Sequence, residues 1–282
     1  MIFTTVAQRI SDSGNDGFAT SCQTLLRGLP RIATALLFLL LGVVPVAGGA
    51  LPETVERLKP SIVAVGTFQK TRSPSFVFRG TGFAVEDGTL IATAAHVLPE
   101  TLQTEKFETM LILVRVPGVR EPQAREAKTV AVDKEHDVAL LKITGAPLPA
   151  VAFGDPAAVR DGQSIAFTGF PFGSAFGFYP VTHRGIIASL APIALPRATA
   201  RELDAHAIQS LKASPFILFQ LDATAYPGHS GSPLYDGDSG DVIGVVNMGF
   251  LKGAKDAAIG QPSGISFAIP IQYLRDLIRA PR

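Results

Sequence analysis

The sequence predicts an all-β protein in which short strands form two antiparallel barrels. Most apolar segments after residue 50 are short, alternate with period two and are rich in Val, Ile, Thr and Phe. They recur about every 8–12 residues, with turn signals between them. They also fall into two groups, separated by the linker Gly145-Ala-Pro-Leu-Pro149. Paired antiparallel barrels explain this spacing better than βαβ units do.

Composition and charge argue against a disordered chain, a nucleic-acid-binding protein, a disulfide-stabilised fold and a metalloprotein. The 282-residue chain is 47% hydrophobic and 17% charged, which is typical of a folded protein with a sizeable core. Its net charge is +1 without a basic block, so we expect no nucleic-acid partner. Cys22 is the only cysteine, so the folded part has no disulfide. The five histidines include no His-x-x-x-His pair, and we expect neither a metal nor a cofactor.

Residues 1–50 are interpreted as a signal peptide or an N-terminal anchor. Arg27 and Arg31 precede the apolar run Ile32–Val46, and the small residues Ala47–Ala50 follow it. This pattern indicates a secretory signal. The run is shorter than the roughly 20 residues that a membrane span needs. We therefore expect an exported protein, periplasmic or extracellular. An uncleaved anchor, the one case that would bring a membrane contact, remains open.

A short helix is predicted at the start of the folded part. Leu51, Val55 and Leu58 have helical spacing and Pro60 follows them, which predicts a helix over Leu51–Lys59. The first group of strands comes next, with turn signals containing Gly or Pro between several of them. The predicted strands are Ile62–Phe68, Thr81–Glu86, Leu90–Ala94, Met110–Val116, Thr129–Asp133 and Val138–Ile143.

The second group of strands follows the linker. Its predicted members are Ala150–Phe153, Ser164–Gly169, Val181–Ser189, Phe216–Leu221, Pro233–Tyr235, Val242–Met248 and Ile265–Pro270. Between two of them, Ala198–Lys212 has few β-branched residues and predicts a helical insertion. At the end of the chain, Ile271, Leu274 and Leu277 share one face, which predicts an amphipathic helix over Pro270–Arg279.

The segment Pro227–Leu234 has the composition of a tight turn that presents Ser230. Gly228 and Gly231 permit positive φ, and a proline near each end restricts the backbone there. Such a turn can aim backbone N–H groups at one point, and amides that converge beside a nucleophile can form an oxyanion hole. A serine hydroxyl also needs an adjacent base. No histidine follows Ser230, so the base must lie upstream.

Two upstream residues suit this serine. His96 follows the end of the strand Leu90–Ala94 among small residues, where it can project into a cleft. Asp137 opens the apolar strand Val138–Ile143, and burial of its carboxylate requires a hydrogen bond such as one from an imidazole N–H. The order His96, Asp137, Ser230 predicts a catalytic triad, with the histidine as base and the aspartate holding its tautomer.

At these residues the chain resembles the trypsin-like serine peptidases. Their three motifs are similar to Thr93-Ala-Ala-His96, Asp137-Val-Ala-Leu-Leu141 and Gly228-His-Ser-Gly-Ser-Pro-Leu234. A narrower resemblance, to the HtrA (Deg) protease domain, covers nearly all of the chain after residue 50. It rests on the motifs Gly80–Phe83, Gly169–Gly173, Gly185–Leu190, Asp222–Gly228 and Gly264–Pro270.

The resemblance implies a chymotrypsin-like fold of two six-stranded antiparallel barrels with a C-terminal helix. Residues 51–282 are then one peptidase domain, with barrels at 51–146 and 147–269 and the helix at 270–282. It also implies a serine endopeptidase that hydrolyses polypeptides through an acyl-enzyme on Ser230. The backbone N–H groups of Gly228 and Ser230 are expected to form the oxyanion hole. HtrA proteins often form trimers, so a trimer is expected by resemblance alone.

By the same resemblance, Thr224 lies near the base of the primary specificity pocket. Its side chain carries no charge, so small or medium apolar substrate residues are expected there rather than Lys or Arg. The chain departs from the HtrA pattern at His229, where the family usually has Asn, and at Ser232, where it has Gly. We expect the protease domain without the PDZ domain that is typical of HtrA proteins.

Because residue 229 is a histidine, we do not expect activation by cleavage near the N-terminus. A histidine cannot pair with a new N-terminal ammonium group as the aspartate of digestive trypsins does. We therefore expect any switching to involve the loops around Gly169–Phe178 and Gly185–Leu195. Two other functions remain open. One is a catalytically inactive protease fold that binds other proteins, and the other is an esterase with the same triad.

Overall fold

A computed structural model describes residues 51–116, 118–173, 177–193, 216–247 and 264–281 of the chain. The N-terminal segment 1–50, interpreted above as a signal peptide or anchor, lies outside these described residues. The predicted helical insertion Ala198–Lys212 lies outside them as well.

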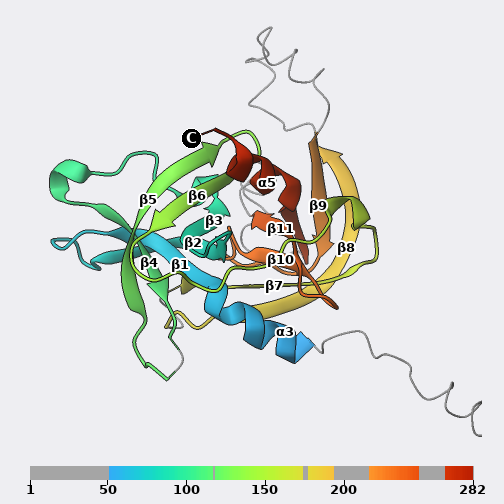
Figure 1. The fold of residues 1–282 in the computed structure, drawn as a ribbon, viewed down its shortest axis with the longest axis horizontal. Helices are drawn as coiled ribbons and strands as arrows, with labels where there is room; N and C mark the ends of the chain where they lie inside the picture. The colour runs from blue at the N-terminus through green and yellow to red at the C-terminus, as the bar shows by residue number, and fades with distance from the viewer. Residues whose placement is uncertain (1–50, 117, 174–176, 194–215, 248–263, 282) are drawn as a thin grey trace, which may run out of the picture. The chain divides into compact units, whose positions relative to one another are not determined.

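Six antiparallel strands close the first barrel in the order β1-β2-β3-β6-β5-β4 (Figure 1). The strands are β1 (Ile62–Phe68), β2 (Phe76–Val85), β3 (Leu90–Ala94), β4 (Thr109–Val114), β5 (Gln123–Asp133) and β6 (Val138–Ile143). β1, β3 and β6 have the predicted bounds because their apolar runs are almost wholly buried. β5 begins six residues earlier than predicted. Its first half is largely exposed and charged, which hides the alternation that sequence reasoning looks for.

The second barrel is closed by six further antiparallel strands in the order β10-β11-β12-β9-β8-β7. The strands are β7 (Ser164–Gly169), β8 (Val181–Ile193), β9 (Phe216–Asp222), β10 (Pro233–Asp236), β11 (Val242–Asn247) and β12 (Ile265–Pro270). Because β8 pairs with β9 as far as Ile193, most of the predicted switching loop Gly185–Leu195 is strand. The two closed barrels confirm the predicted all-β, chymotrypsin-like fold.

The predicted strand Ala150–Phe153 is wrong. Among the described residues, its only ladder contact is an isolated bridge from its last residue to Val242. The Val151 N–H donates to the Ala84 carbonyl of the first barrel over 3.0 Å, and the Val242 N–H donates to the Ala152 carbonyl over 2.8 Å. The segment therefore forms backbone hydrogen bonds with both barrels and is a strand of neither sheet.

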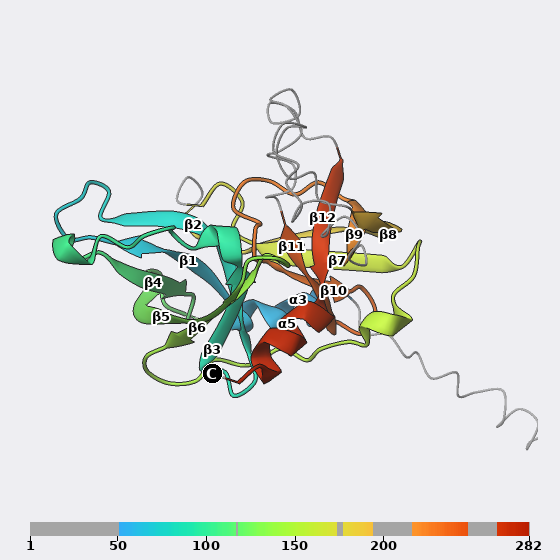
Figure 2. The ribbon, with the colours of Figure 1, turned by 90° about the horizontal axis from the view of Figure 1, so that it is seen from above.

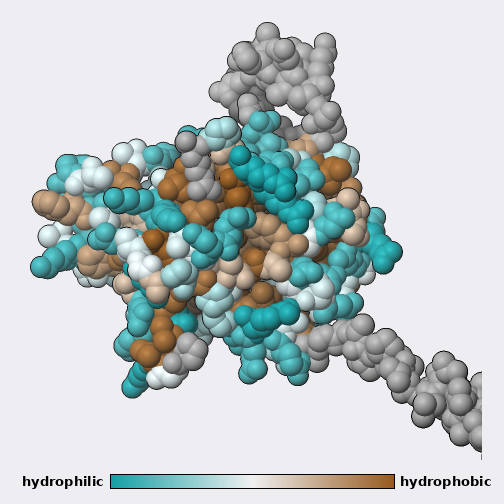
Figure 3. Space-filling model, in the orientation of Figure 1, coloured by the Kyte–Doolittle hydropathy of each residue, from teal (hydrophilic) through white to brown (hydrophobic). Residues whose placement is uncertain are grey.

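Two helices flank the barrels, and both lie on the same face of the barrel pair (Figures 1 and 2). α3 (Leu51–Leu58) ends one residue before the predicted helix does, and Lys59–Ser61 continues it as a 3₁₀ turn. α5 (Ile271–Arg279) buries Ile271 and Leu274 completely. On this face hydrophilic residues predominate, with smaller hydrophobic patches between them (Figure 3).

Apolar side chains form a core inside each barrel and a third cluster between the barrels. The third cluster joins Phe83 and Leu140 of the first barrel to Leu218 and Val245 of the second, and Leu274 of α5 packs on it. All five side chains are fully buried. Because the barrels share this core, loops at their junction are supported from both sides. The candidate active site lies among these loops.

Candidate active site

His96 lies on a 3₁₀ turn, Ala95–Val97, that directly follows β3. β3 is buried along its whole length and pairs with β2 and β6, so the start of this turn is anchored on both sides. The Ala95 N–H donates to the Asp137 carbonyl over 3.1 Å. The histidine side chain is partly exposed, with 26% of its surface accessible. The structure thus puts His96 at a strand end, as predicted.

Asp137 lies in the turn between β5 and β6 and has a left-handed backbone, with φ at 54°. Aspartate tolerates this region better than most residues with a side chain. Its carboxylate accepts two hydrogen bonds from His96. The His96 backbone N–H donates to Oδ1 over 2.8 Å, and the ring Nδ1 lies 2.6 Å from Oδ2. Together these bonds fix both the position and the orientation of the imidazole.

Ser230 lies in the connection between β9 and β10, and its Oγ is 2.8 Å from His96 Nε2. Since Nδ1 donates its proton to Asp137, Nε2 is free to accept the Ser230 hydroxyl proton. A serine in this contact can transfer its proton to the imidazole while Oγ attacks a carbonyl carbon. The structure therefore brings the three predicted triad residues together at the junction of the barrels.

The residues before Ser230 form a type II turn from Tyr226 to His229. The His229 N–H donates to the Tyr226 carbonyl over 3.0 Å, Pro227 occupies the second position, and Gly228 has φ at 105° in the third. A Cβ on Gly228 would lie 2.2 Å from the Phe170 carbonyl oxygen, so only glycine fits. Among the described residues, neither the Gly228 N–H nor the Ser230 N–H has an acceptor. Two unpaired amides that flank a nucleophile can bind an oxyanion.

Two neighbouring segments hold this turn. The Phe172 N–H donates to the Pro227 carbonyl over 2.8 Å. That carbonyl and the Gly228 N–H belong to one planar peptide and point in opposite directions, so the bond orients the Gly228 N–H. From β2, the Thr81 hydroxyl donates to the Gly228 carbonyl over 2.8 Å and accepts the Phe170 N–H over 3.1 Å. Both barrels therefore contribute to the conformation of the turn.

Sequence reasoning did not find the residue that supports the acid of the candidate triad from the second barrel. Asn247 ends β11 with its side chain fully buried, and its amide donates to Asp137 Oδ2. The carboxylate of Asp137 therefore receives hydrogen bonds from both barrels. A possible signal was a single amide side chain at the end of the otherwise apolar strand Val242–Asn247.

A comparison with protein-family models matches the model of the trypsin-like peptidase domain to residues 80–245. This match spans more than half of the chain and includes the three residues of the candidate triad. The chain belongs to the trypsin-like peptidase family.

Curated relatives narrow the assignment within the family. A "Probable periplasmic serine endoprotease DegP-like" of Halomonas elongata is 34% identical over 198 residues, which are 70% of this chain and 34% of that protein. A protein of the same description from Pseudomonas putida (strain W619) is 31% identical over 70% of this chain and 33% of its own length. "Serine protease HTRA2, mitochondrial" of Bos taurus is 30% identical over 80% of this chain and 42% of its own length. The chain spans less than half the length of these relatives. Their similarity to it confirms the predicted resemblance to the HtrA (Deg) proteases.

The two departures from the HtrA pattern, His229 and Ser232, are both fully buried. Burial, with a smaller contribution from the nearby His183, lowers the pKa of His229 to about 3. The Ser232 hydroxyl has no partner among the described residues and lies against Gly169. A Cβ on Gly169 would lie 2.1 Å from the Ser232 Oγ, so the glycine makes room for the serine. Both residues are accommodated while Gly228 keeps the positive φ of the type II turn.

Thr224 is half-buried in the connection that follows β9. The residues on either side of it are held by Ser266 of β12. The Ala225 N–H donates to the Ser266 hydroxyl over 2.9 Å, and this hydroxyl donates to the Ala223 carbonyl over 2.7 Å. The connection between β11 and β12 lies almost entirely outside the described residues. The specificity pocket at Thr224 stays a prediction.

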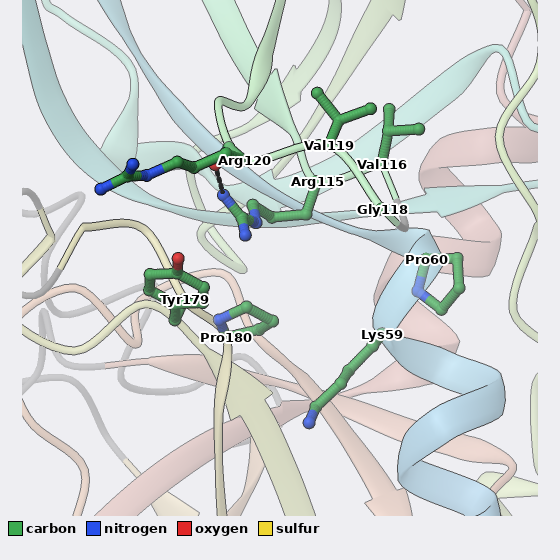
Figure 4. Close-up of a pocket in the computed structure, with 9 residues that line it drawn as sticks. All are labelled: Lys59, Pro60, Arg115, Val116, Gly118, Val119, Arg120, Tyr179 and Pro180. Carbon is green, nitrogen blue, oxygen red and sulfur yellow. Dashed lines mark hydrogen bonds between the residues drawn. The ribbon is translucent and has the colours of Figure 1, made fainter.

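A cavity of about 510 Å³, lined by none of the triad residues, lies where the 3₁₀ turn Lys59–Ser61, the β4–β5 connection and the segment before β8 meet (Figure 4). The Arg115 guanidinium lies 4.3 Å from the centre of the Tyr179 ring and donates to the Arg120 carbonyl over 2.6 Å. Lys59 points into the same space from another side (Figure 4). The contact between Arg115 and Tyr179 joins the β4–β5 connection to the segment that leads into β8.

The described part of the chain shows neither a metal site nor a helix that could span a membrane. It contains no group of three or more His, Cys, Asp or Glu side chains arranged to hold a metal ion. None of its helices has the length and apolar character that crossing a membrane requires.

Proposed function

We propose that this chain is a serine endopeptidase that hydrolyses peptide bonds through an acyl-enzyme on Ser230. The contact of 2.8 Å between His96 Nε2 and Ser230 Oγ carries the proposal, because the Asp137 carboxylate holds the other ring nitrogen at 2.6 Å. Membership of the trypsin-like peptidase family and the likeness to serine endoproteases support it.

In the proposed reaction, Ser230 Oγ attacks the substrate carbonyl while His96 Nε2 accepts the hydroxyl proton. Asp137 stabilises the imidazolium, which then donates its proton to the leaving amine. Water, activated by the same histidine, hydrolyses the acyl-enzyme. The amides of Gly228 and Ser230 bind the oxyanion at each tetrahedral stage. Loss of one such donor lowers kcat about 10²–10³-fold in other enzymes, so the turn matters as much as the triad.

Unfolded or exposed polypeptide is the proposed substrate. The side chain at Thr224 carries no charge, so cleavage after small or medium apolar residues is expected if it forms the base of the pocket. The relatives described as periplasmic endoproteases support an exported protein that acts in the periplasm or outside the cell. A trimer is part of the same proposal by family likeness, and sedimentation velocity measures it.

A fluorophosphonate probe tests the enzyme proposal directly. The wild-type chain should be labelled covalently, the Ser230→Ala variant should not, and casein should be cleaved faster than short-chain esters are hydrolysed. Equal labelling of wild type and Ser230→Ala would overturn the proposal in favour of an inactive binding module. Faster turnover of the esters would favour an esterase.

A further inference from the structure

His229 lies between the two residues whose amides would bind the oxyanion, and its side chain is completely buried. Its ring packs edge to face with Phe167 of β7, at a centroid distance of 5.2 Å, and with His183 of β8, at 4.9 Å. The imidazole ring therefore packs inside the second barrel, while the backbone of His229 forms the last residue of the turn Tyr226–His229. Because the ring is fixed by the barrel, its packing can restrain the backbone conformation of the turn.

Two hydrogen bonds connect His229 with Tyr226, three residues earlier. The His229 N–H donates to the Tyr226 carbonyl over 3.0 Å, which closes the type II turn through the backbone. The Tyr226 N–H donates to the imidazole Nδ1, also over 3.0 Å, which closes the same turn through the side chain. The imidazole thus closes a second ring around Pro227 and Gly228.

The second bond requires Nδ1 to be unprotonated. Nδ1 also lies 3.2 Å from the Tyr226 carbonyl, to which a protonated Nδ1 would donate instead. That arrangement would leave the Tyr226 N–H without an acceptor among the described residues, whereas the carbonyl already accepts the His229 N–H. The first arrangement leaves fewer polar groups unpaired, so the neutral ring with its proton on Nε2 is favoured.

We propose that His229 is a positioning residue for the oxyanion hole, acting through the hydrogen bond from the Tyr226 N–H to its neutral Nδ1. This inference rests on the proposed function. The bond keeps the turn closed, so that the amides of Gly228 and Ser230 converge before a substrate arrives. His183 and Tyr226 are the titratable groups packed against the ring, and no carboxylate among the described residues contacts it.

The charge state of His229 explains why this turn needs no partner ion. A carboxylate buried at the same place would require a cation, because an unpaired buried charge strongly destabilises a folded protein. A neutral imidazole accepts the same kind of hydrogen bond without that requirement. The packing of His229 in the second barrel therefore helps to order the turn, together with the Thr81 hydroxyl of the first barrel, without a pairing ion at position 229.

Two substitutions separate the hydrogen bond from the packing of the ring. His229→Asn keeps an acceptor, because Oδ1 is as many bonds from Cα as Nδ1 is, but it loses ring volume. His229→Leu keeps most of the volume and loses the acceptor. We expect kcat to fall about 10²-fold or more in His229→Leu, with KM nearly unchanged, since oxyanion contacts strengthen in the transition state. His229→Asn should stay within about tenfold of wild type.

His183→Asn is the matched control, because His183 packs on the same ring and makes no hydrogen bond to the turn. It should change kcat less than about threefold. If His229→Leu is as active as His229→Asn, or if His183→Asn loses as much activity as His229→Leu, the packing of the ring and not the acceptor holds the turn. Either result would overturn the inference.

An NMR measurement tests the inference without activity. In wild-type protein with ¹⁵N-labelled histidine, the His229 Nδ1 should show the shift of an unprotonated ring nitrogen, and the Tyr226 amide should exchange slowly with solvent. A protonated Nδ1, or fast exchange at Tyr226, would overturn the inference. If the wild type does not react with the fluorophosphonate probe, the proposed function fails, while the NMR result still decides on the turn.

Discussion

At the residue scale, the contacts of Asp137 determine which nitrogen of His96 carries the proton. Its carboxylate accepts the His96 backbone N–H, the ring Nδ1–H and the Asn247 amide. Three donors from two barrels converge on one carboxylate whose own backbone lies in the left-handed region. Such conformations persist where surrounding structure over-determines them. The acid of the proposed triad is therefore held more firmly than its position in a turn would indicate.

Replacing this carboxylate by an amide tests the tautomer argument. In Asp137→Asn, an amide N–H facing the ring would favour a proton on Nε2, and the imidazole could no longer accept the Ser230 proton. We expect kcat to fall about 10⁴-fold with the fold intact. Asp133→Asn is the matched control, because Asp133 makes the same kind of contact with His136, at 2.6 Å, away from the serine. A comparable loss in Asp133→Asn would contradict the assignment.

Thr81 connects the first barrel to the turn Tyr226–His229 through one hydroxyl. Thr81→Val preserves the shape of the side chain but leaves the Phe170 N–H and the Gly228 carbonyl without this partner. Each buried group left unpaired costs about 1–3 kcal/mol. We expect the urea midpoint to fall and kcat to fall about tenfold or more, because the turn loses its support. Thr144→Val, at an exposed threonine, should change neither; unchanged kcat in Thr81→Val would contradict the role of this hydroxyl.

At the scale of elements, the C-terminal helix α5 stabilises both barrels. Its buried side chains belong to the cluster between the barrels, and Arg275 donates to the Gly154 carbonyl, in the connection between β6 and β7, over 2.8 Å. His136 of the β5–β6 turn stacks on Tyr273 of the helix at a centroid distance of 3.9 Å. The helix therefore contacts the turn that carries Asp137, in addition to the strands beneath it.

Truncation of a buried side chain in α5 should therefore destabilise the whole domain. Leu274→Ala removes a side chain with no exposed surface, which costs about 2–5 kcal/mol of unfolding free energy. Gln272→Ala, on the exposed face of the same helix, should cost less than about 0.5 kcal/mol. Urea denaturation followed by far-UV circular dichroism measures both. Equal midpoints for the two variants would show that α5 does not share the common core.

At the scale of the whole molecule, His229 makes stability depend on pH. Its pKa is about 3 in the folded chain, against about 6.5 for an ordinary histidine. Between these values the unfolded chain binds the extra proton, so the free energy of unfolding decreases as the pH falls. This contribution is fully present above about pH 6.5 and changes by up to about 1.4 kcal/mol per pH unit below it.

His229→Asn should therefore flatten the pH dependence of stability. Urea midpoints at about pH 5 and about pH 7 should differ less in this variant than in wild type. Ser230→Ala, which lies in the same loop and removes no titratable histidine, should keep the wild-type slope. An unchanged slope in His229→Asn would mean that this imidazole does not stay neutral in the folded chain.

Sequence reasoning predicted much of this fold because buried strands carry their own signal. Five predicted strands have the observed bounds, and in each of them buried residues predominate. It failed where exposure or tertiary pairing decides the structure. The charged first half of β5 does not alternate visibly, and Ala150–Phe153 reads as a strand although its hydrogen bonds go to two barrels.

The amino-acid sequence by itself determined the order His96, Asp137, Ser230 and the residue types that a nucleophilic serine requires, because turn glycines and short apolar strands are local features. Only the tertiary structure decided that Asn247 reaches Asp137 and that Phe172 and Thr81 hold the turn, because these bonds join segments far apart in the chain. The same holds for His229. The sequence shows it only as a departure from the HtrA pattern, whereas the structure shows that its ring is buried and that its Nδ1 accepts the Tyr226 N–H.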